Sequence, residues 1–550
     1  MSDEYKITFL GGLGEIGRNC AVVEKDDRLL VIDCGIMFPN PDMLGVDLVL
    51  PDFSYILERR DKVEGIVLTH GHEDHVGALS YLLKDVNAQI FGSAFTLEIA
   101  RGRIEEAGIS LHNKLVVVKD GERKAIGPFD VEFIPVTHSV PHGFAIAIHG
   151  PFGVILHTGD FKIDLSPVDD RRTDLGRIGQ IAKDEQIALL LSDSTNADEP
   201  GFTDSESNVG KTLNTIFTSY KDTRIIVACF ASHIHRIQQL LDAAVLSGRK
   251  VALIGRSMLR SVNIARELGI INVAPGVLVE IEELNRCKPG EICIISTGSQ
   301  GESMSALTLL ASGSNKSITL TDNDLVVLSS HVIPGNEWSV TEVVNNLARK
   351  NVEVINSETA EVHASGHARR GELATLLSIA NPKCFIPVHG EHRHLLSHAN
   401  LAMEMGVSPD NIVICEDGDQ VLLTKDGIEL TDEIPAEYTY VDGIIGDLKE
   451  VLRDRRFLSK EGVVVAAVSV LNGEMVAGPE IVSKGWIDQE SEELFTKKAK
   501  RVIAEAVAYA IADGQVDGDQ IKRIIKRNLS KLVYEYSKSR PIIIPLVLTK

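Results

Sequence analysis

The chain of 550 residues lacks paired cysteines, a long apolar run and an excess of positive charge. Its seven cysteines are scattered and none forms a Cys-x-x-Cys pair, so reduced core thiols are expected rather than disulfides or a cysteine metal cluster. The longest apolar run, Val463 to Leu471, is far shorter than the ~20 residues that span a bilayer. The N-terminus, Met1 to Tyr5, is acidic and has no signal-peptide apolar region. A cytoplasmic location without membrane contact is the expectation.

The net charge of −22 argues against a nonspecific coat of nucleic acid around this protein. It leaves open a polyanion held in one locally positive channel with metal ions. Among the basic clusters, Arg369-Arg370 is the best candidate for such a contact, although basic runs are more often solvated faces. The length predicts roughly two to four domains.

Four potential metal ligands fall within six residues: His70, His72, Asp74 and His75. They follow an apolar run, Gly65 to Thr69, that predicts a buried strand, and Gly71 is expected to permit a sharp turn at its end. Imidazole and carboxylate together suit zinc and similar ions. The alternative is a polar loop with coincidental histidines. The density favours two metals, one on His70 and His72 and the other on Asp74 and His75.

Further ligands are expected where later apolar strands end. Asp160 follows such a strand in a Thr-Gly-Asp turn and is the candidate that bridges both ions. His138 would complete the first ion and His389 the second, and such a pair of ions can stabilise charge on a phosphoryl group. His142 lies in the same loop as His138, and spacing alone does not decide between them. His157 lies inside the strand before Asp160, where a packing or supporting role is favoured.

Two changes of pattern suggest further domains. From about Val209 strands alternate with amphipathic helices, which predicts a separate parallel α/β unit. From about residue 450 the pattern reads as strand, helix, helix, strand, a small α+β domain. Near the N-terminus, Gly11 to Gly17 precedes another strand instead of a helix, so a tight turn near the metals is preferred to a dinucleotide site.

The ligand series, with a gap of 229 residues between Asp160 and His389, resembles a metallo-β-lactamase core that carries an insertion, as in the β-CASP nucleases. Asp193 in Ser192 to Ala197, His367 and His389 match the motifs of that group. The resemblance narrows to the ribonuclease J family and covers essentially the whole chain. The sequences that carry it are Gly11 to Gly17, Ile254-Gly255-Arg256-Ser257-Met258, Thr297-Gly298-Ser299-Gln300-Gly301-Glu302, Ile333-Pro334-Gly335-Asn336 and Pro387-Val388-His389-Gly390-Glu391.

The resemblance implies an α/β fold: a metallo-β-lactamase αββα sandwich, an inserted β-CASP domain and a small C-terminal α+β domain. The expected boundaries are 1–208 and 356–448 for the core, 209–355 for the insertion, 449–460 for a linker and 461–550 for the C-terminal domain.

The resemblance also implies a site. One metal takes His70, His72 and His138, which decides for His138 over His142, and the other takes Asp74, His75 and His389, with Asp160 bridging. Asp193 and His367 form the acid–base pair, without a decision on which gives the proton. The residues expected to bind substrate are Ser232, His233, Ile234, His363, Ala364, Ser365, Gly366 and His367. His233 departs from the family, which usually has Asn there, so phosphate binding at this position would vary with pH.

Two zinc ions per subunit are expected, with Mn²⁺ or Mg²⁺ able to take their place. A calcium ion near Leu44, Val46 and Asp442 is carried as a further expectation, although Asp442 is equally a turn residue. The implied activity is 5′-to-3′ exonuclease action on single-stranded RNA with a 5′-monophosphate, plus internal cutting, in RNA maturation and decay. A homodimer or homotetramer and RNA-decay partners are also implied.

Three other functions compete with this expectation. A small-molecule hydrolase such as a thioesterase would not need the insertion or the motifs at Asp193 and His367. A DNA-acting β-CASP nuclease is the nearer rival, which the ribonuclease J motifs disfavour. A non-catalytic RNA-binding scaffold is disfavoured because ligands stand at all seven metal positions.

Overall fold

The computed structural model describes residues 4–111, 114–302, 304–333, 335–446, 448–514 and 517–549, without the side chains of residues 444–446, 489 and 490. It divides into two compact units, one formed by Met1–Phe38 and Leu48–Val441 and the other by Pro39–Asp47 and Asp442–Lys550. Pro334, in one of the family-like motifs, lies outside the described residues. Among the described helices, none is long and apolar enough to cross a membrane.

The first unit contains two sheets packed face to face. The eight-stranded sheet has the order β22 (Ile428–Glu433), β21 (Asp419–Leu423), β1 (Tyr5–Gly11), β3 (Cys20–Lys25), β4 (Arg28–Ile32), β6 (Val63–Val67), β7 (Gln89–Gly92), β8 (Leu115–Val117). The six-stranded sheet has the order β19 (Cys384–Val388), β13 (Ile187–Asp193), β12 (Gly153–His157), β11 (Gly143–Gly150), β10 (Phe129–Val136), β9 (Arg123–Ile126). Alternate apolar side chains of both sheets, such as Phe9 and Phe133, form the core between them.

Helices cover the outer face of each sheet. One layer packs on the eight-stranded sheet and consists of α1 (Ser54–Leu57), α2 (Glu73–Val76), α3 (Leu79–Leu82) and α4 (Ala94–Glu106). The other packs on the six-stranded sheet and consists of α5 (Leu175–Asp184), α11 (Arg370–Ala380) and α12 (His392–Glu404). Two short pairings join distant segments, β2 (Leu13–Gly14) with β20 (Gly390–Glu391) and β5 (Leu48–Leu50) with β23 (Thr439–Asp442). The four layers confirm the expected αββα sandwich.

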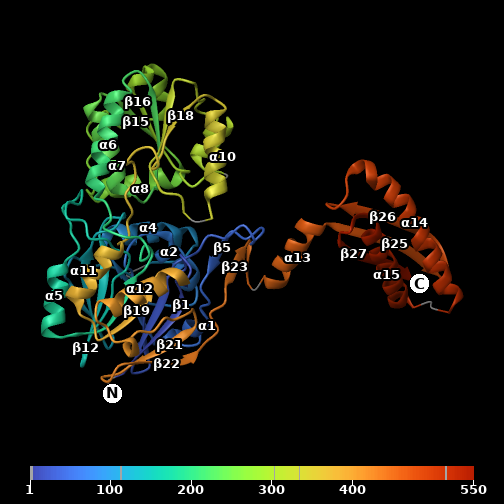
Figure 1. Cartoon of the computed structure of the whole chain (residues 1–550), viewed down its shortest axis with the longest axis horizontal. Helices are drawn as coiled ribbons and strands as arrows, with labels where there is room; N and C mark the ends of the chain where they lie inside the picture. The colour runs from blue at the N-terminus through green and yellow to red at the C-terminus, as the bar shows by residue number, and fades with distance from the viewer. Residues whose placement is uncertain are drawn as a thin grey trace. The chain divides into compact units, whose positions relative to one another are not determined.

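An inserted domain interrupts this sandwich between β13 and β19 (Figure 1). Its five parallel strands have the order β15 (Lys250–Ile254), β16 (Ile292–Ser296), β14 (Arg224–Ala228), β17 (Asp324–Leu328), β18 (Glu353–Ile355). Its helices are α6 (Glu206–Ser219), α7 (Ile234–Leu246), α8 (Arg256–Glu267), α9 (Ala306–Ser312) and α10 (Glu337–Ala348). Apolar cores lie on both faces of this sheet, as parallel sheets require. The expected parallel α/β unit is confirmed.

The second unit holds a three-stranded sheet under two long helices. Its elements are β24 (Ile444–Gly446), α13 (Lys449–Glu461), β25 (Val463–Leu471), β26 (Glu474–Lys484), α14 (Gln489–Ala512), α15 (Gly518–Ser537) and β27 (Ile542–Thr549). The expected linker 449–460 forms helix α13. The expected pattern of strand, helix, helix, strand lacked one strand, because a hairpin of β25 and β26 stands where a single strand was expected.

A buried ion pair ties the inserted domain to the segment that carries His363 and His367. The Arg236 side chain is fully buried, and its Nη2 donates to Glu206 Oε2 at 2.8 Å. Its Nη1 donates to Val362 O at 2.7 Å and to Ser329 O at 3.1 Å. One guanidinium on α7 therefore joins α6, the end of β17 and the chain just before His363.

Replacing Arg236 should destabilise this connection strongly. Arg236→Met leaves the buried Glu206 carboxylate without its partner, which costs about 3–5 kcal/mol of unfolding free energy. Arg101→Met is the matched control, because the Arg101–Glu98 pair is exposed on α4 and such pairs contribute about 0–1 kcal/mol. Native-state hydrogen exchange of the β14 and β17 amides measures the loss of stability in each of the two variants. Equal protection in the two variants would contradict the assigned role, and adding Glu206→Leu to Arg236→Met should restore part of the loss.

Candidate metal centre

Four ligand atoms converge where strands of both sheets end: His70 Nε2, His72 Nδ1, His138 Nε2 and Asp160 Oδ2. His70 Nε2 lies 3.0 Å from His72 Nδ1 and 3.5 Å from Asp160 Oδ2. His138 Nε2 lies 3.2 Å from His72 Nδ1 and 3.9 Å from Asp160 Oδ2. A tetrahedral zinc ion with bonds of about 2.0–2.1 Å separates its ligands by about 3.3 Å. This donor set therefore fits one zinc ion.

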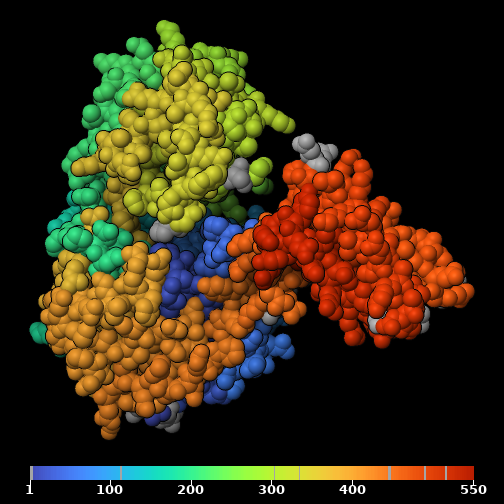
Figure 2. Space-filling view, turned by 45° about the vertical axis from the view of Figure 1, so that its right-hand side comes forward, coloured from blue at the N-terminus to red at the C-terminus, as the bar shows by residue number. Residues whose placement is uncertain are grey.

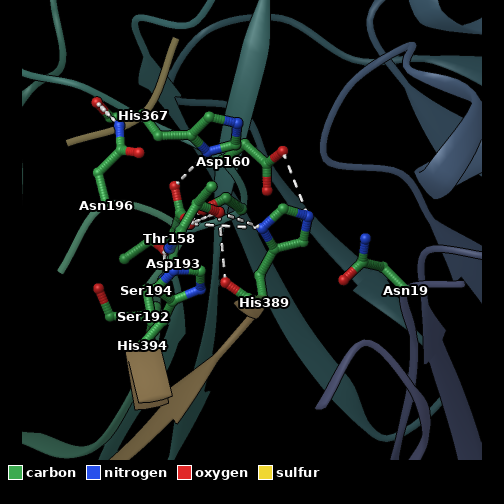
Figure 3. A network of polar contacts seen from close by, with 12 residues as sticks. Asn19, Thr158, Asp160, Ser192, Asp193, Ser194, Asn196, His367, His389 and His394 are labelled. Atoms are coloured by element: carbon green, nitrogen blue, oxygen red, sulfur yellow. Dashed lines mark hydrogen bonds and ion pairs between the residues drawn. The ribbon is translucent and has the colours of Figure 1, made fainter. Parts of the chain in front are cut away.

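A second group lies beside the first and consists of Asp74, His75, Asp160 and His389. His75 Nε2 lies 3.6 Å from Asp74 Oδ2 and 3.2 Å from Asp160 Oδ2. His389 Nε2 lies 3.4 Å from Asp74 Oδ2 and 3.8 Å from Asp160 Oδ2. These separations also suit one tetrahedral ion, and the oxygen that both groups share is Asp160 Oδ2. Figure 3 shows Asp160 and His389 facing one another.

The buried carboxylates of the two ligand groups require positive charge close to them. Burial lowers the pKa of His70 and His138 well below the usual value and that of His72 to about 4, so these rings are neutral, as metal ligands must be. Burial acts in the same direction on His75 and His389. There Asp160 and the neighbouring carboxylates outweigh it, raising the pKa of His75 well above its usual value and that of His389 to about 10. Without a metal, these two rings carry the positive charge that the buried carboxylates require.

Asp33 orients the ring of His75. Its Oδ2 lies 2.8 Å from His75 Nδ1, and the backbone N–H and hydroxyl of Thr69 donate to its two oxygens at 2.8 and 2.7 Å. The backbone of Asp33 is left-handed, with φ 60°, and so is that of the ligand His389, with φ 55°. Such conformations cost about 1–3 kcal/mol in residues other than glycine and cluster at functional sites. Asp33 leaves Nε2 of His75 as the nitrogen available to a metal.

Two more bonds orient the rings of His138 and His389. His138 Nδ1 donates to Gly366 O at 2.7 Å, and a side chain at position 366 would put its Cβ 2.6 Å from His138 Cε1. Thr195 Oγ1 lies 2.7 Å from His389 Nδ1, and His389 N donates to Gly12 O at 3.1 Å. The glycine-rich loop therefore fixes the backbone of a ligand, as the expectation of a turn near the metals required.

Asp193 and His367 lie together beside the two ligand groups. Asp193 Oδ2 is 2.8 Å from His367 Nδ1 (Figure 3). Asp193 Oδ1 accepts from the backbone N–H and the hydroxyl of Thr195. Burial raises the pKa of Asp193, but His367 and His389 outweigh burial and hold it well below its usual range. Burial lowers the pKa of His367, and the Asp193 carboxylate outweighs it and raises that pKa. Nε2 is the nitrogen of His367 left for a substrate.

The competing histidines lie outside both ligand groups. His142 has φ 59° and lines a neighbouring pocket, and none of the ligand groups among the described residues includes it. His157 Nδ1 accepts from Gly159 N at 3.0 Å, which fixes the turn that presents Asp160. Gly71 has no left-handed φ, and a Cβ there would meet only ordinary contacts from 3.5 Å outward. The chain does bend at Gly71, between β6 and the extended His72 that begins α2, but nothing at this position requires a glycine.

The residues expected to bind substrate are divided between a pocket and the core. His233, Ala364 and Ser365 line one pocket together with His138 and Lys162. Ser365 Oγ accepts from Asn196 Nδ2 at 2.9 Å and from His367 N at 3.2 Å.

The other expected substrate residues have less freedom to meet a ligand there. The Ile234 side chain is fully buried, and its N–H donates to Ser232 O at 2.9 Å. His363 Nδ1 is buried without a hydrogen-bond partner among the described residues. Burial lowers the pKa of His363 to about 3, so that ring is neutral.

Arg455 contacts residues that were expected to bind calcium. Within the second unit, Arg455 Nη1 donates to Leu44 O at 2.8 Å and its Nη2 forms an ion pair with Asp442 Oδ2. Val46 is a buried residue of the same loop. A guanidinium therefore uses two of the oxygens that a calcium ion would need, and these residues do not fit calcium as they stand.

Four family models match successive parts of the chain. They are described as Metallo-beta-lactamase superfamily for residues 13–197, Ribonuclease J, beta-CASP domain for 222–347, Zn-dependent metallo-hydrolase RNA specificity domain for 353–414, and Ribonuclease J C-terminal domain for 450–549.

Full-length relatives give the same result. The chain is 41% identical over 551 residues to Ribonuclease J 1 of Streptococcus pyogenes, covering 100% of this chain and 98% of that protein. It is 41% identical to Ribonuclease J of Mycolicibacterium smegmatis, covering 99% and 97% of the two chains, and 35% identical to Ribonuclease J2 of Bacillus subtilis, covering 100% and 99%. A crystal structure of a protein of unknown function from Enterococcus faecalis, 16% identical with a TM-score of 0.54, covers 76% of this chain and 100% of that one and shares its fold.

The shared oxygen of Asp160 gives a test of the two-ion arrangement. Asp160→Ala removes a ligand from both groups at once, so the affinity for both ions should fall by more than the ~10–100-fold typical of losing a supporting residue. Elemental analysis after dialysis and competition with a chelator measure this. His142→Ala is the matched control, because His142 lies in the loop of His138 but outside the ligand groups, and this variant should keep both ions. Unchanged affinity for two ions in Asp160→Ala would refute the bridging role.

Proposed function

This chain belongs to the ribonuclease J family, and we propose that it trims RNA from a 5′-monophosphate end and also cuts RNA internally. The observation that carries the proposal is the pair of four-ligand groups that share Asp160 Oδ2 and lie beside the Asp193–His367 pair. Zinc ions held there, with Mn²⁺ or Mg²⁺ as substitutes, would supply an activated water and stabilise charge on the phosphoryl group. The first ion would be held by His70, His72 and His138 and the second by Asp74, His75 and His389.

His367 is proposed to act on the leaving group. Its Nδ1 is engaged by Asp193, whose other oxygen is engaged by Thr195, so only Nε2 remains for the substrate. Hydrolysis joins the water oxygen to phosphorus and breaks the bond from phosphorus to O3′, and His367 would donate the proton that O3′ requires. Asp193 is then the positioning partner. The remaining RNA carries a new 5′-monophosphate, which makes a repeated, stepwise reaction possible.

The pocket beside the metal centre is proposed to hold the terminal phosphate. Ser365 lines it, and its hydroxyl accepts two bonds from the protein, which leaves its proton free to donate to a phosphate oxygen. His233, from the inserted domain, lines the same pocket, with Nε2 at 3.6 Å from Glu206 Oε2. Because His138 lines the same pocket, a terminal phosphate there is next to the first metal group.

RNA as the substrate fits the family and its RNA specificity domain. We further propose cytoplasmic work in RNA maturation and decay, which agrees with seven cysteines that form no disulfide. A homodimer or homotetramer, and partners in an RNA-decay complex, follow from the family resemblance and remain proposals. Sedimentation of the purified protein would give the oligomeric state.

The state of the RNA end should decide the mode of cleavage. RNA with a 5′-monophosphate should be degraded stepwise to mononucleotides, whereas a 5′-triphosphate adds bulk and charge that the pocket does not admit. Matched RNAs with monophosphate, triphosphate and hydroxyl ends, and a DNA of the same sequence, measure this through product sizes. Equal rates on monophosphate and triphosphate RNA would remove the case for the pocket, and preferred cleavage of the DNA would favour the rival nuclease.

Variants at Ser365 separate end recognition from catalysis. Ser365→Leu should fill the pocket and suppress stepwise degradation more than internal cutting, because an internal cut needs no terminal phosphate. Ser365→Ala keeps the space and removes only the hydroxyl, so its effect should be smaller. Equal loss of both activities in Ser365→Leu would show that the residue supports the shared catalytic centre instead.

His367→Ala should slow cleavage by about 10²–10⁴-fold, the range of general acid–base contributions, while both ions stay bound. Rates on one RNA at equal metal content give the ratio. Loss of an ion in elemental analysis would show that His367 is a metal ligand.

A further inference from the structure

One edge of the inserted domain collects the loops that leave its parallel strands. The carboxyl ends of parallel strands meet at a single edge, where α/β proteins bind their ligands. His233 follows β14 at that edge, and the segment that carries His363 follows β18. The described parts of the loops after β16 and β17, residues 297–302, 304–305, 329–333 and 335–336, lie along the same edge.

The loops after β16 and β17 are fastened to each other. Gln300 Nε2 donates to His331 O at 2.8 Å, and Gln300 Oε1 accepts from Ile333 N at 2.8 Å. Gly301 packs so closely on the start of α10 that a Cβ there would lie 2.5 Å from the carbonyl carbon of Ser339. These contacts hold the two loops and the first turn of α10 as one surface.

This surface exposes large apolar side chains that folding does not use. Trp338 is 76% exposed, Met304 is 80% exposed and Ile333 is 43% exposed. We name these three residues the platform. A group of exposed large apolar side chains marks a binding site more often than a single one does. The second of the two tryptophans, Trp486, behaves differently and packs on Phe495 with ring centroids 4.8 Å apart.

The platform adjoins the segment that leads to the proposed substrate pocket. The ring of His331, in the loop fastened to the platform, stacks on His363 with centroids 6.2 Å apart and an interplanar angle of 22°. His363 begins the segment that ends at His367, beside the metal groups. Figure 1 shows one end of α10 close to the metallo-β-lactamase core, and Figure 2 shows a recess beneath the yellow part of the inserted domain.

We propose that the platform is a stacking site for the bases of single-stranded RNA, with Trp338 as its principal residue. The inference rests on the proposed function and adds a substrate-binding contact outside the catalytic groups. RNA is the occupant because His331, in the loop fastened to the platform, stacks on His363, whose segment lines the proposed phosphate pocket with Ala364 and Ser365. Glu302 and Glu337 lie next to the platform residues in the sequence and are exposed. Carboxylates repel the RNA backbone, so attraction at this point must come from the faces of the bases, which stack on aromatic rings in any sequence.

Tryptophan fluorescence reports the contact directly. Trp486→Phe leaves Trp338 as the only fluorescent tryptophan in the full chain with its metals bound. A 5′-phosphorylated, 2′-O-methyl oligoribonucleotide that resists cleavage should quench it, and an oligonucleotide with the same backbone but abasic positions should not. Binding of both is followed independently by the anisotropy of a label on the RNA. In Trp338→Phe, where Trp486 alone reports, the same RNA should leave the fluorescence unchanged.

Affinity variants complete the test. Trp338→Ala should weaken binding of the RNA by about 5- to 150-fold, the range of one base stacked on an aromatic ring, and Trp338→Phe should retain most of the affinity. Leu246→Ala is the matched control, because Leu246 is 72% exposed at the opposite end of the same domain. If RNA binds without quenching Trp338, the platform is not a stacking site, and the proposed function still stands. Failure of wild-type protein to bind any RNA would sink the proposed function itself. Unchanged RNA affinity in Trp338→Ala with an altered oligomeric state would assign the platform to a second copy of the chain and overturn RNA as its occupant.

Discussion

The shared oxygen of Asp160 is the constraint on which the rest of the centre depends. A carboxylate that is 3% exposed is costly unless opposite charge lies close, and one oxygen within 3.9 Å of four imidazole nitrogens satisfies that requirement only if those rings keep fixed orientations. The supporting bonds have this purpose. Asp33 orients His75, Gly366 orients His138 and Thr195 orients His389. Left-handed backbone at Asp33 and His389 shows that the fold accepts local strain to complete the arrangement.

The insertion shapes what can reach this centre. It leaves the sandwich after β13 and returns before β19, two adjacent parallel strands whose ends present Asp193 and His389. The returning chain carries Gly366 against His138 and His367 against Asp193. A segment anchored to the inserted domain by Arg236 therefore orients the ring of His138 and supplies one member of the Asp193–His367 pair. A shift of the inserted domain would therefore alter catalysis as well as substrate access. A binding module attached to an active site that is complete without it would alter only access.

Sequence alone predicted the parts of this protein that follow local rules. Strands ending in His or Asp predicted where Asp160 and Asp193 would stand, and the alternation after Val209 predicted the parallel sheet. The ligands' supporting residues were missed because they depend on contacts between distant segments. Thr195 lies within a recognised motif and Asp33 ends a strand as Asp160 does, so a signal existed for both. Nothing local marks Asn19, whose Nδ2 reaches Asp74 O at 3.1 Å. The hairpin of β25 and β26 was missed because it reads as one apolar run followed by mixed residues.

The acidic character of the chain constrains how it can hold RNA. Arg370, expected to contact the RNA backbone, has its Nη2 on Glu404 Oε2 at 2.6 Å, and Arg171 beside the terminal pocket has its guanidinium on Asp120 at 2.8 Å. Lys162 in the same pocket is 3% exposed and donates to Asp204 O at 3.0 Å. Cations that are already paired release few counterions from a nucleic acid and contribute little to its affinity. In the proposed function, binding then draws on the metal centre, on neutral donors such as Ser365, and on base stacking. The proposed stacking of bases on Trp338 would supply attraction that a chain of net charge −22 does not readily obtain from phosphates.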